Sequence, residues 1–143
     1  MMSARFLLAI LCLFAALSDA KATCYKQAAM QYQLDPLLLK AIAQVESSGD
    51  PSAVRVNKDL SKDFGLMQIN SIHLDELQKR GITEKKLLNG CINLKVASRI
   101  LRGHINHYGL NWYAVGAYHS KTPSRNIVYQ KKVISAYQKL SVT

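Results

Sequence analysis

Residues Asp63 to Asn70 read Asp-Phe-Gly-Leu-Met-Gln-Ile-Asn, and this stretch decides how the rest of the chain is interpreted. Gly65 permits close approach of another backbone segment, and the polar residues Gln68 and Asn70 alternate with apolar ones. The alternation predicts that polar side chains share one face of a short segment. Because amides both donate and accept hydrogen bonds, such a face suits a ligand rich in hydroxyl and acetamido groups, such as a sugar. The alternative is a buried loop whose Gln and Asn side chains bond only to the backbone.

An apolar helix is predicted upstream of this stretch, from Pro36 to about Ser47, because Asp35 and Pro36 form a helix-start signal. Glu46 lies at the end of this helix, just before the helix-breaking run Ser48–Pro51. A carboxyl group at this place is expected to face a cleft. Partial burial would raise its pKa, as a general acid working near neutral pH requires. The alternative for Glu46 is a solvated surface charge.

Helical periodicity and cap signals predict that most of the remaining chain is also helical. One predicted helix contains Ala28, Ala29 and Tyr32. The others are Ser71–Arg80, a short helix from Thr83 to Gly90, a long helix from about Ile92 to Tyr108, Trp112–Tyr118 and Ile127–Leu140. The stretch Ser48–Ser61 is rich in turn residues and is expected to hold a short hairpin at most. The predicted fold class is mostly α, a single helical domain with a short irregular or β-hairpin segment lining the cleft.

The aromatic run Trp112–Ser120 is a third feature that suits a sugar ligand, because aromatic faces can stack on pyranose rings. The alternative is that these aromatic residues belong to the core or its rim.

The composition and the first residues describe an exported domain. The chain has 143 residues, of which 49% are hydrophobic and 20% charged, and these values exclude disordered, collagenous and coiled-coil classes. Arg5 precedes the apolar run Phe6–Leu17, which is followed by small residues at Ser18, Ala20 and Ala22. This layout predicts a signal peptide at 1–20, cleaved after Ala20 or Ala22, and a working domain at 21–143 in the periplasm. A membrane anchor is the weaker alternative, because a spanning helix needs about twenty apolar residues.

The cysteines and the net charge fit export. Cys12 lies inside the predicted leader, which leaves Cys24 and Cys91 as an even pair in an exported protein. A disulfide between them is therefore predicted, with two buried free thiols as the alternative. The formal charge of +10 is expected to hold the protein on an anionic envelope. Because export is predicted, and because His104 and His107 lack a third ligand at metal spacing, neither nucleic-acid binding nor a metal site is predicted.

Several separate motifs together resemble the motif series of the family 1 lytic transglycosylases. They are, in order, Glu46-Ser47, Gly65–Asn70, Asn93 ahead of Ala97, Ile100 and Leu101, and Ala117-Tyr118. The small size, the signal peptide, the cysteine pair and the run Tyr118–Pro123 further resemble the single-domain enzymes that accompany type III secretion, type IV pili and conjugation machines. The resemblance implies a lysozyme-like α+β fold.

The resemblance also implies roles for individual residues. Glu46 would be the catalytic acid and base, Tyr118 would steady Glu46 and the scissile sugar, and further residues would bind the substrate, namely Ser47, Met67, Gln68, Asn70 and His119. The sequence departs from the family at Ala117-Tyr118-His119-Ser120-Lys121, where Ala-Tyr-Asn-x-Gly is usual.

Asp63 is a second departure from the family pattern. Its separation from Glu46 along the sequence equals that of the two catalytic carboxyls in animal-type lysozymes. Asp63 is predicted to stay ionised and to stabilise positive charge at the anomeric carbon. The alternative is a loop aspartate beside Lys62 with no catalytic role.

The function implied is cleavage of the β-1,4 bond between N-acetylmuramic acid and N-acetylglucosamine, without a metal or organic cofactor, to give 1,6-anhydromuramoyl products. The expected partners are peptidoglycan strands and components of a secretion or pilus apparatus, for which the wall would be opened. Neither stable membrane insertion after signal cleavage nor oligomerisation is expected. The alternatives are a muramidase that hydrolyses the bond with Glu46 and Asp63, and a non-catalytic peptidoglycan-binding assembly factor.

Overall fold

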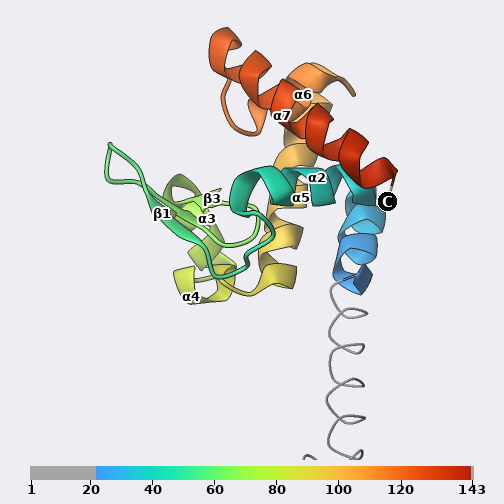
Figure 1. Cartoon of the computed structure of the whole chain (residues 1–143). Helices are drawn as coiled ribbons and strands as arrows, with labels where there is room; N and C mark the ends of the chain where they lie inside the picture. The colour runs from blue at the N-terminus through green and yellow to red at the C-terminus, as the bar shows by residue number, and fades with distance from the viewer. Residues whose placement is uncertain (1–21, 143) are drawn as a thin grey trace, which may run out of the picture.

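The computed structural model of the chain describes residues 22–142, which form mainly helices with one small sheet (Figure 1). The predicted mostly α, lysozyme-like single domain is confirmed. After a first helical segment at 22–32, the elements are α2 Pro36–Ser47, β1 Val54–Val56, β2 Lys62–Phe64, β3 Ile69–Asn70, the 3-10 turn η1 Ser71–His73, α3 Leu74–Lys79, α4 Glu84–Leu87, α5 Gly90–Tyr108, α6 Trp112–Ala117 and α7 Pro123–Ser141.

The helix α2 begins and ends where the local sequence requires. The Asp35 side chain accepts a hydrogen bond from the Leu37 backbone N–H at 2.7 Å, and Pro36 occupies the first turn. The helix stops because Ser48 adopts the left-handed conformation, with φ at 55°. Glu46 is thereby held in the last turn of a helix whose position is fixed at both ends.

Two predicted helix starts differ from the structure. Asn70, rather than Ser71, caps the segment that follows β3, and this segment begins as the 3-10 turn η1 before α3. The last helix, α7, begins at Pro123 rather than at Ile127, because proline in the first helical turn is preorganised for the helix.

The three strands form an antiparallel sheet in the order β1-β2-β3. The sequence predicted a short hairpin at most, so the third strand is an addition, and β2 lies beyond the stretch expected to hold the hairpin. Strands of two or three residues carry too little alternation to be recognised. Their register has a direct consequence, because Asp63 on β2 lies opposite Asn70 on β3.

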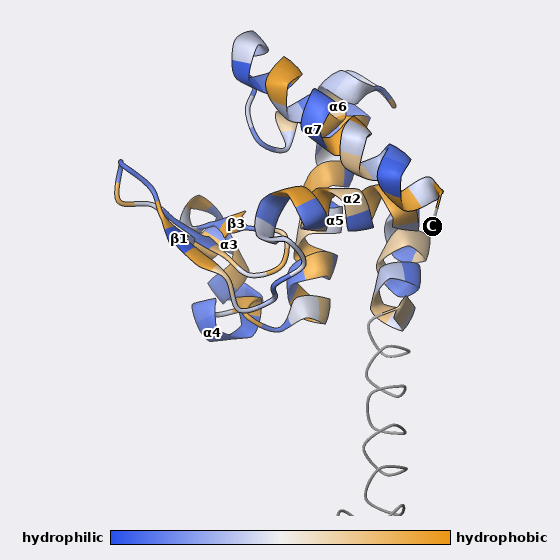
Figure 2. Ribbon diagram, viewed as in Figure 1, coloured by the Kyte–Doolittle hydropathy of each residue, from blue (hydrophilic) through white to orange (hydrophobic). Residues whose placement is uncertain are grey.

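The core lies where α2, α5 and α7 meet the loop between β2 and β3. Leu39, Ile42, Met67, Leu101 and Val133 are each fully buried there. Figure 1 shows the strands with α3 and α4 on one side of α2, and α6 and α7 on the other. In Figure 2, α2 and α5 carry both hydrophobic and hydrophilic residues, as helices with one buried face do, whereas α4 is mainly hydrophilic.

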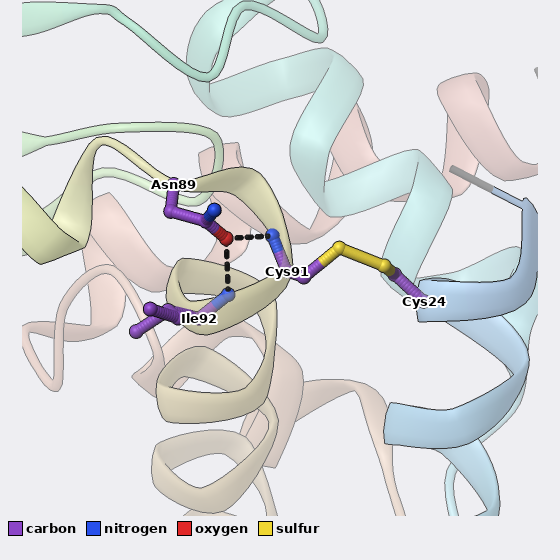
Figure 3. The surroundings of a disulfide bond; sticks show 4 residues. All are labelled: Cys24, Asn89, Cys91 and Ile92. Carbon is purple, nitrogen blue, oxygen red and sulfur yellow. Dashed lines mark hydrogen bonds between the residues drawn. A yellow bond between two sulfur atoms is a disulfide. The ribbon is translucent and has the colours of Figure 1, made fainter. Parts of the chain in front are cut away.

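A disulfide between Cys24 and Cys91 joins the helix at 22–32 to the first turn of α5 (Figure 3). The two Cα atoms are 5.5 Å apart and the residues are separated by 67 positions. The Asn89 side chain caps α5 by accepting hydrogen bonds from the Cys91 and Ile92 backbone N–H groups, both at 3.1 Å. The predicted pairing is confirmed, and the alternative of free thiols is wrong. In the chain-entropy model, closing a loop of this size stabilises the fold by roughly 4 kcal/mol.

The predicted signal peptide at 1–20, together with Cys12, lies outside the described residues. Among residues 22–142, none of the helices combines the length and apolar character that crossing a bilayer would take.

Candidate active site

A cleft of about 610 Å³ opens between the sheet and the segment that follows α6. Its walls include both predicted catalytic carboxyls and four of the predicted substrate-binding residues, namely Glu46, Asp63, Gln68, Asn70, Tyr118 and His119. The structure therefore brings together residues from α2, the sheet, the loop before β3 and the end of α6. Within residues 22–142, no group of three or more His, Cys, Asp or Glu side chains is placed to hold a metal ion.

Glu46 is a half-buried carboxyl at the cleft end of α2. The Tyr129 hydroxyl on α7 donates a hydrogen bond to its Oε1 atom at 2.5 Å. Burial raises the pKa of the Glu46 carboxyl above its usual value, and this effect outweighs the hydrogen bond from Tyr129 and the nearby charge of Arg55, which both lower it. The Asp63 charge adds to the increase. A carboxyl group that keeps its proton to higher pH is suited to act as a general acid.

Tyr129 is a site residue that the sequence analysis did not identify. It is 4% exposed, and burial raises the pKa of its hydroxyl well above the usual value, so the group stays a neutral donor. The available signal was periodicity, because the buried residues Asn126, Tyr129 and Val133 follow one face of α7. Periodicity marks an inward-facing tyrosine but does not identify the carboxyl that its hydroxyl contacts.

Tyr118 was predicted to steady Glu46, and the structure gives its hydroxyl a different partner. The Tyr118 hydroxyl donates to the backbone carbonyl of Met67 at 2.7 Å. Tyr118 thus ties the end of α6 to the loop before β3, whereas the hydroxyl that bonds Glu46 is that of Tyr129. The charge of Glu46 still contributes, after burial, to raising the pKa of Tyr118, which places the two side chains in the same electrostatic environment.

Asp63 is held in the cleft by two amide donors. The Asn70 side chain donates to Oδ1 at 2.8 Å and the Asn57 side chain donates to Oδ2 at 3.0 Å. The pairing of β2 with β3 supplies the first donor, and the hairpin between β1 and β2 supplies the second. Both oxygens of Asp63 therefore accept hydrogen bonds, which fix the orientation of its carboxyl group. Asp63 lies in strand β2 rather than in a loop.

Gln68 combines the two alternatives that the sequence left open. Its side-chain amide donates to the backbone carbonyls of Gly65 at 2.9 Å and Ala53 at 3.3 Å, yet it lines the cleft and remains 8% exposed. Its backbone φ of 50° lies in the left-handed region. The side chain thus braces the loop while it presents a polar edge to the cleft.

The Asn93 side chain on α5 holds the loop between β2 and β3 in place. It is fully buried, and its amide donates to the carbonyls of Phe64 at 2.7 Å and Leu87 at 2.8 Å. Its carbonyl accepts from the Met67 backbone N–H at 2.8 Å. Gly65 must be glycine here, because its φ is 74° and a Cβ atom would lie 2.3 Å from the Leu87 carbonyl oxygen. One side chain therefore fixes the loop that carries Gln68.

Ser47 and Met67 support the cleft from behind and are not among its lining residues. The Ser47 hydroxyl donates to the Leu66 carbonyl at 2.7 Å, and the Met67 side chain is fully buried. His119 is exposed in the cleft, where its ring stacks on that of Tyr129 with centroids 4.8 Å apart and planes inclined by 6°. His119 thus contacts the residue that bonds Glu46.

The comparisons with known proteins agree with this geometry. A family model described as "Transglycosylase SLT domain" matches residues 23–137. The chain belongs to this family. The SLT match spans nearly all of the described residues and confirms the resemblance to lytic transglycosylases that the motifs indicated.

Curated relatives of the SLT-domain chain share most of its length. It is 44% identical over 129 residues to "Invasion protein IagB" of Salmonella typhi, a match that covers 87% of this chain and 81% of the relative. It is 40% identical over 119 residues to "Protein IpgF" of Shigella flexneri, covering 82% and 77%. It is 35% identical over 137 residues to a "Peptidoglycan-binding-like protein" of Escherichia coli O157:H7, covering 87% and 82%.

Proposed function

We propose that the protein is a peptidoglycan lytic transglycosylase that cleaves the β-1,4 bond between N-acetylmuramic acid and N-acetylglucosamine. The observation that carries the proposal is the protonatable Glu46 carboxyl, half-buried in a cleft lined by hydrogen-bonding side chains and bonded to Tyr129. Membership of the SLT family and similarity to a relative named for peptidoglycan binding support peptidoglycan as the substrate.

In the first step of the proposed mechanism, Glu46 donates its proton to the glycosidic oxygen while the bond from that oxygen to C1 of the muramoyl residue breaks. Positive charge develops at C1, and the carboxylate of Asp63, oriented by Asn70 and Asn57, stabilises it electrostatically. The hydrogen bond from Tyr129 strengthens as Glu46 becomes negative.

In the second step, the Glu46 carboxylate accepts the proton of the C6 hydroxyl of the same muramoyl residue, and O6 bonds to C1. Glu46 regains its proton, and the product carries a 1,6-anhydro ring. Because the nucleophile belongs to the same sugar, its effective concentration exceeds that of water.

Hydrolysis is the second candidate reaction, and the doubly hydrogen-bonded Asp63 is the observation that favours it. A muramidase would use the same two carboxyls and admit water to C1, leaving a reducing end. A third reading, a non-catalytic peptidoglycan-binding assembly factor, would use the cleft for binding alone.

The proposed location is the periplasm, which the predicted signal peptide supports. The proposed role is local opening of the cell wall for a secretion or pilus apparatus. The resemblance to single-domain enzymes of such machines supports this role, and the relative named as an invasion protein is consistent with it.

The experiment that tests the proposed function is digestion of purified sacculi by the protein without residues 1–20, followed by mass spectrometry of the released ends. Anhydro ends would support a transglycosylase, and reducing ends would assign a muramidase. Release of neither by a correctly folded protein would contradict both reactions. Glu46→Gln is the matched control, because it keeps the shape of the side chain and removes the transferable proton.

A further inference from the structure

The positive charge of this protein is concentrated in the second half of its sequence. No Asp or Glu follows Glu84, whereas ten of the nineteen Lys and Arg residues lie between Lys85 and Lys139. Since the formal net charge is +10, the excess charge belongs to α4, α5, α7 and their connections. Up to Glu84, the nine acidic side chains of the sequence balance nine basic ones.

A groove continues from the active-site cleft along α7. A cavity of about 280 Å³ shares Glu46, Arg55, His119 and Arg125 with the cleft and extends it to Lys132. A further hollow of about 670 Å³ between α2 and α7 begins at Val45 and Lys132 and runs on past Lys131 and Lys139. We call this continuous surface the α7 groove and define it by Arg125, Lys131, Lys132 and Lys139.

Within the described part of the chain, none of the four cations of the α7 groove forms an ion pair. Both ion pairs found in residues 22–142 use Glu76, which bonds Arg80 and Arg99. Glu46, at the entrance, is the sole carboxylate residue among the lining residues of these two hollows. The groove therefore presents exposed positive charge that a ligand can neutralise.

The other half of the cleft has a different chemistry. Around Asp63 it is lined by Asn57 and Asn70, whose amides donate to the carboxylate, and by Ser61, whose hydroxyl oxygen accepts from both amides. Amide and hydroxyl groups suit neutral sugars, whereas isolated lysine and arginine side chains suit carboxylates. The two halves meet at Glu46, so the site combines a surface for sugars with a surface for anions.

We propose that the α7 groove binds the carboxylates of the peptide attached to the muramoyl residue, and that the enzyme prefers peptide-bearing glycan strands. The proposal rests on the proposed function. The peptide is carried by the same sugar whose C1 reacts at Glu46, so it leaves the cleft within one sugar of this residue. The cationic groove begins at that point.

The test compares three soluble substrates: glycan strands with their peptides, the same strands with the peptide carboxylates amidated, and strands freed of peptide. The variant is K131Q with K139Q, two exposed residues that are remote from the lining of the active-site cleft. The control is K85Q with K95Q, which removes the same charge from exposed positions outside the groove.

We expect the groove variant to lose about fivefold in kcat/KM on peptide-bearing strands, the scale of two exposed charge contacts. Amidation of the carboxylates should lower the kcat/KM of the wild-type enzyme by a similar factor. It should lower the kcat/KM of the groove variant only slightly. On strands without peptide, the groove variant, the control variant and the wild type should agree. Activity on strands without peptide tests the proposed function separately, because cleavage of these strands requires Glu46 but no peptide.

An equal loss on all three substrates, or an equal loss in the control variant, would overturn the proposal. So would a wild-type enzyme that does not distinguish free from amidated carboxylates. Cosedimentation with phosphatidylglycerol vesicles covers the other anionic ligand. If Lys131 and Lys139 were needed for vesicle binding and not for substrate preference, the groove would be a membrane contact and the peptide proposal would be wrong.

Discussion

The hydrogen bond from Tyr129 to Glu46 supports a quantitative prediction for Tyr129→Phe. The substitution keeps the buried ring and removes only the hydroxyl that lies 2.5 Å from Oε1. In the proposed mechanism, Glu46 is neutral in the ground state and becomes negative as the glycosidic bond breaks. A hydrogen bond to a neutral partner contributes about 0.5–1.5 kcal/mol and one to a charged partner about 1.5–3 kcal/mol. The bond therefore favours the transition state by about 1 kcal/mol, so we expect kcat to fall roughly fivefold.

The same substitution changes the pH dependence in a defined direction. The Tyr129 hydrogen bond lowers the pKa of Glu46 against the larger effect of burial, so its loss raises that pKa. Activity that requires protonated Glu46 falls as pH rises through its pKa, and this limb of the kcat profile should move to higher pH in Tyr129→Phe.

The assay is release of fragments from soluble glycan strands, followed from acidic to alkaline pH, with thermal unfolding as a check on folding. Tyr137→Phe is the matched control, because Tyr137 also lies on α7 and its hydroxyl bonds a carboxylate, that of Asp35, at 2.5 Å outside the cleft. An unchanged limb in Tyr129→Phe, or the same change in Tyr137→Phe, would refute the reasoning.

Three further predictions follow from the site. Asp63→Asn should lower kcat about 100-fold if the carboxylate stabilises charge at C1, by analogy with the loss of one preorganised group elsewhere; a rate near that of the wild type in the digestion assay would return Asp63 to a structural role. Gly65→Ala should lower the free energy of unfolding by about 3 kcal/mol, because it combines a left-handed φ with a collision at Leu87, and urea denaturation measures this. Glu46→Gln should raise the melting temperature at pH 8 and leave it unchanged at pH 4. The raised pKa means that Glu46 destabilises the fold only once it ionises, and equal melting curves at pH 8 would contradict this.

The helices were predicted well because their signals are local. The Asp35-Pro36 pair gave the start of α2, and Gly109 gave the end of α5 at Tyr108. The third strand was missed, because its pairing depends on a register that two residues cannot specify.

The candidate site was predicted in composition but only partly in geometry. Glu46, Asp63 and Gln68 were recognised from motifs and lie in one cleft. The partner of Glu46 was not recognised, because Tyr129 lies 83 residues away on a helix that carries no motif of its own. The position of Asn70 opposite Asp63 likewise follows from strand pairing, which local sequence patterns do not predict.

The surroundings of the Glu46 carboxyl are complete only when α7 packs against α2. Glu46 is synthesised early, but Tyr129, which orients it, and the wall of helix that shelters it arrive only after α6. A chain without α7 would lack both the Tyr129 hydroxyl and the helix that packs against α2 beside Glu46. The proposed cleavage of glycan would therefore require α7, and a copy truncated before Tyr129 is expected to lack it.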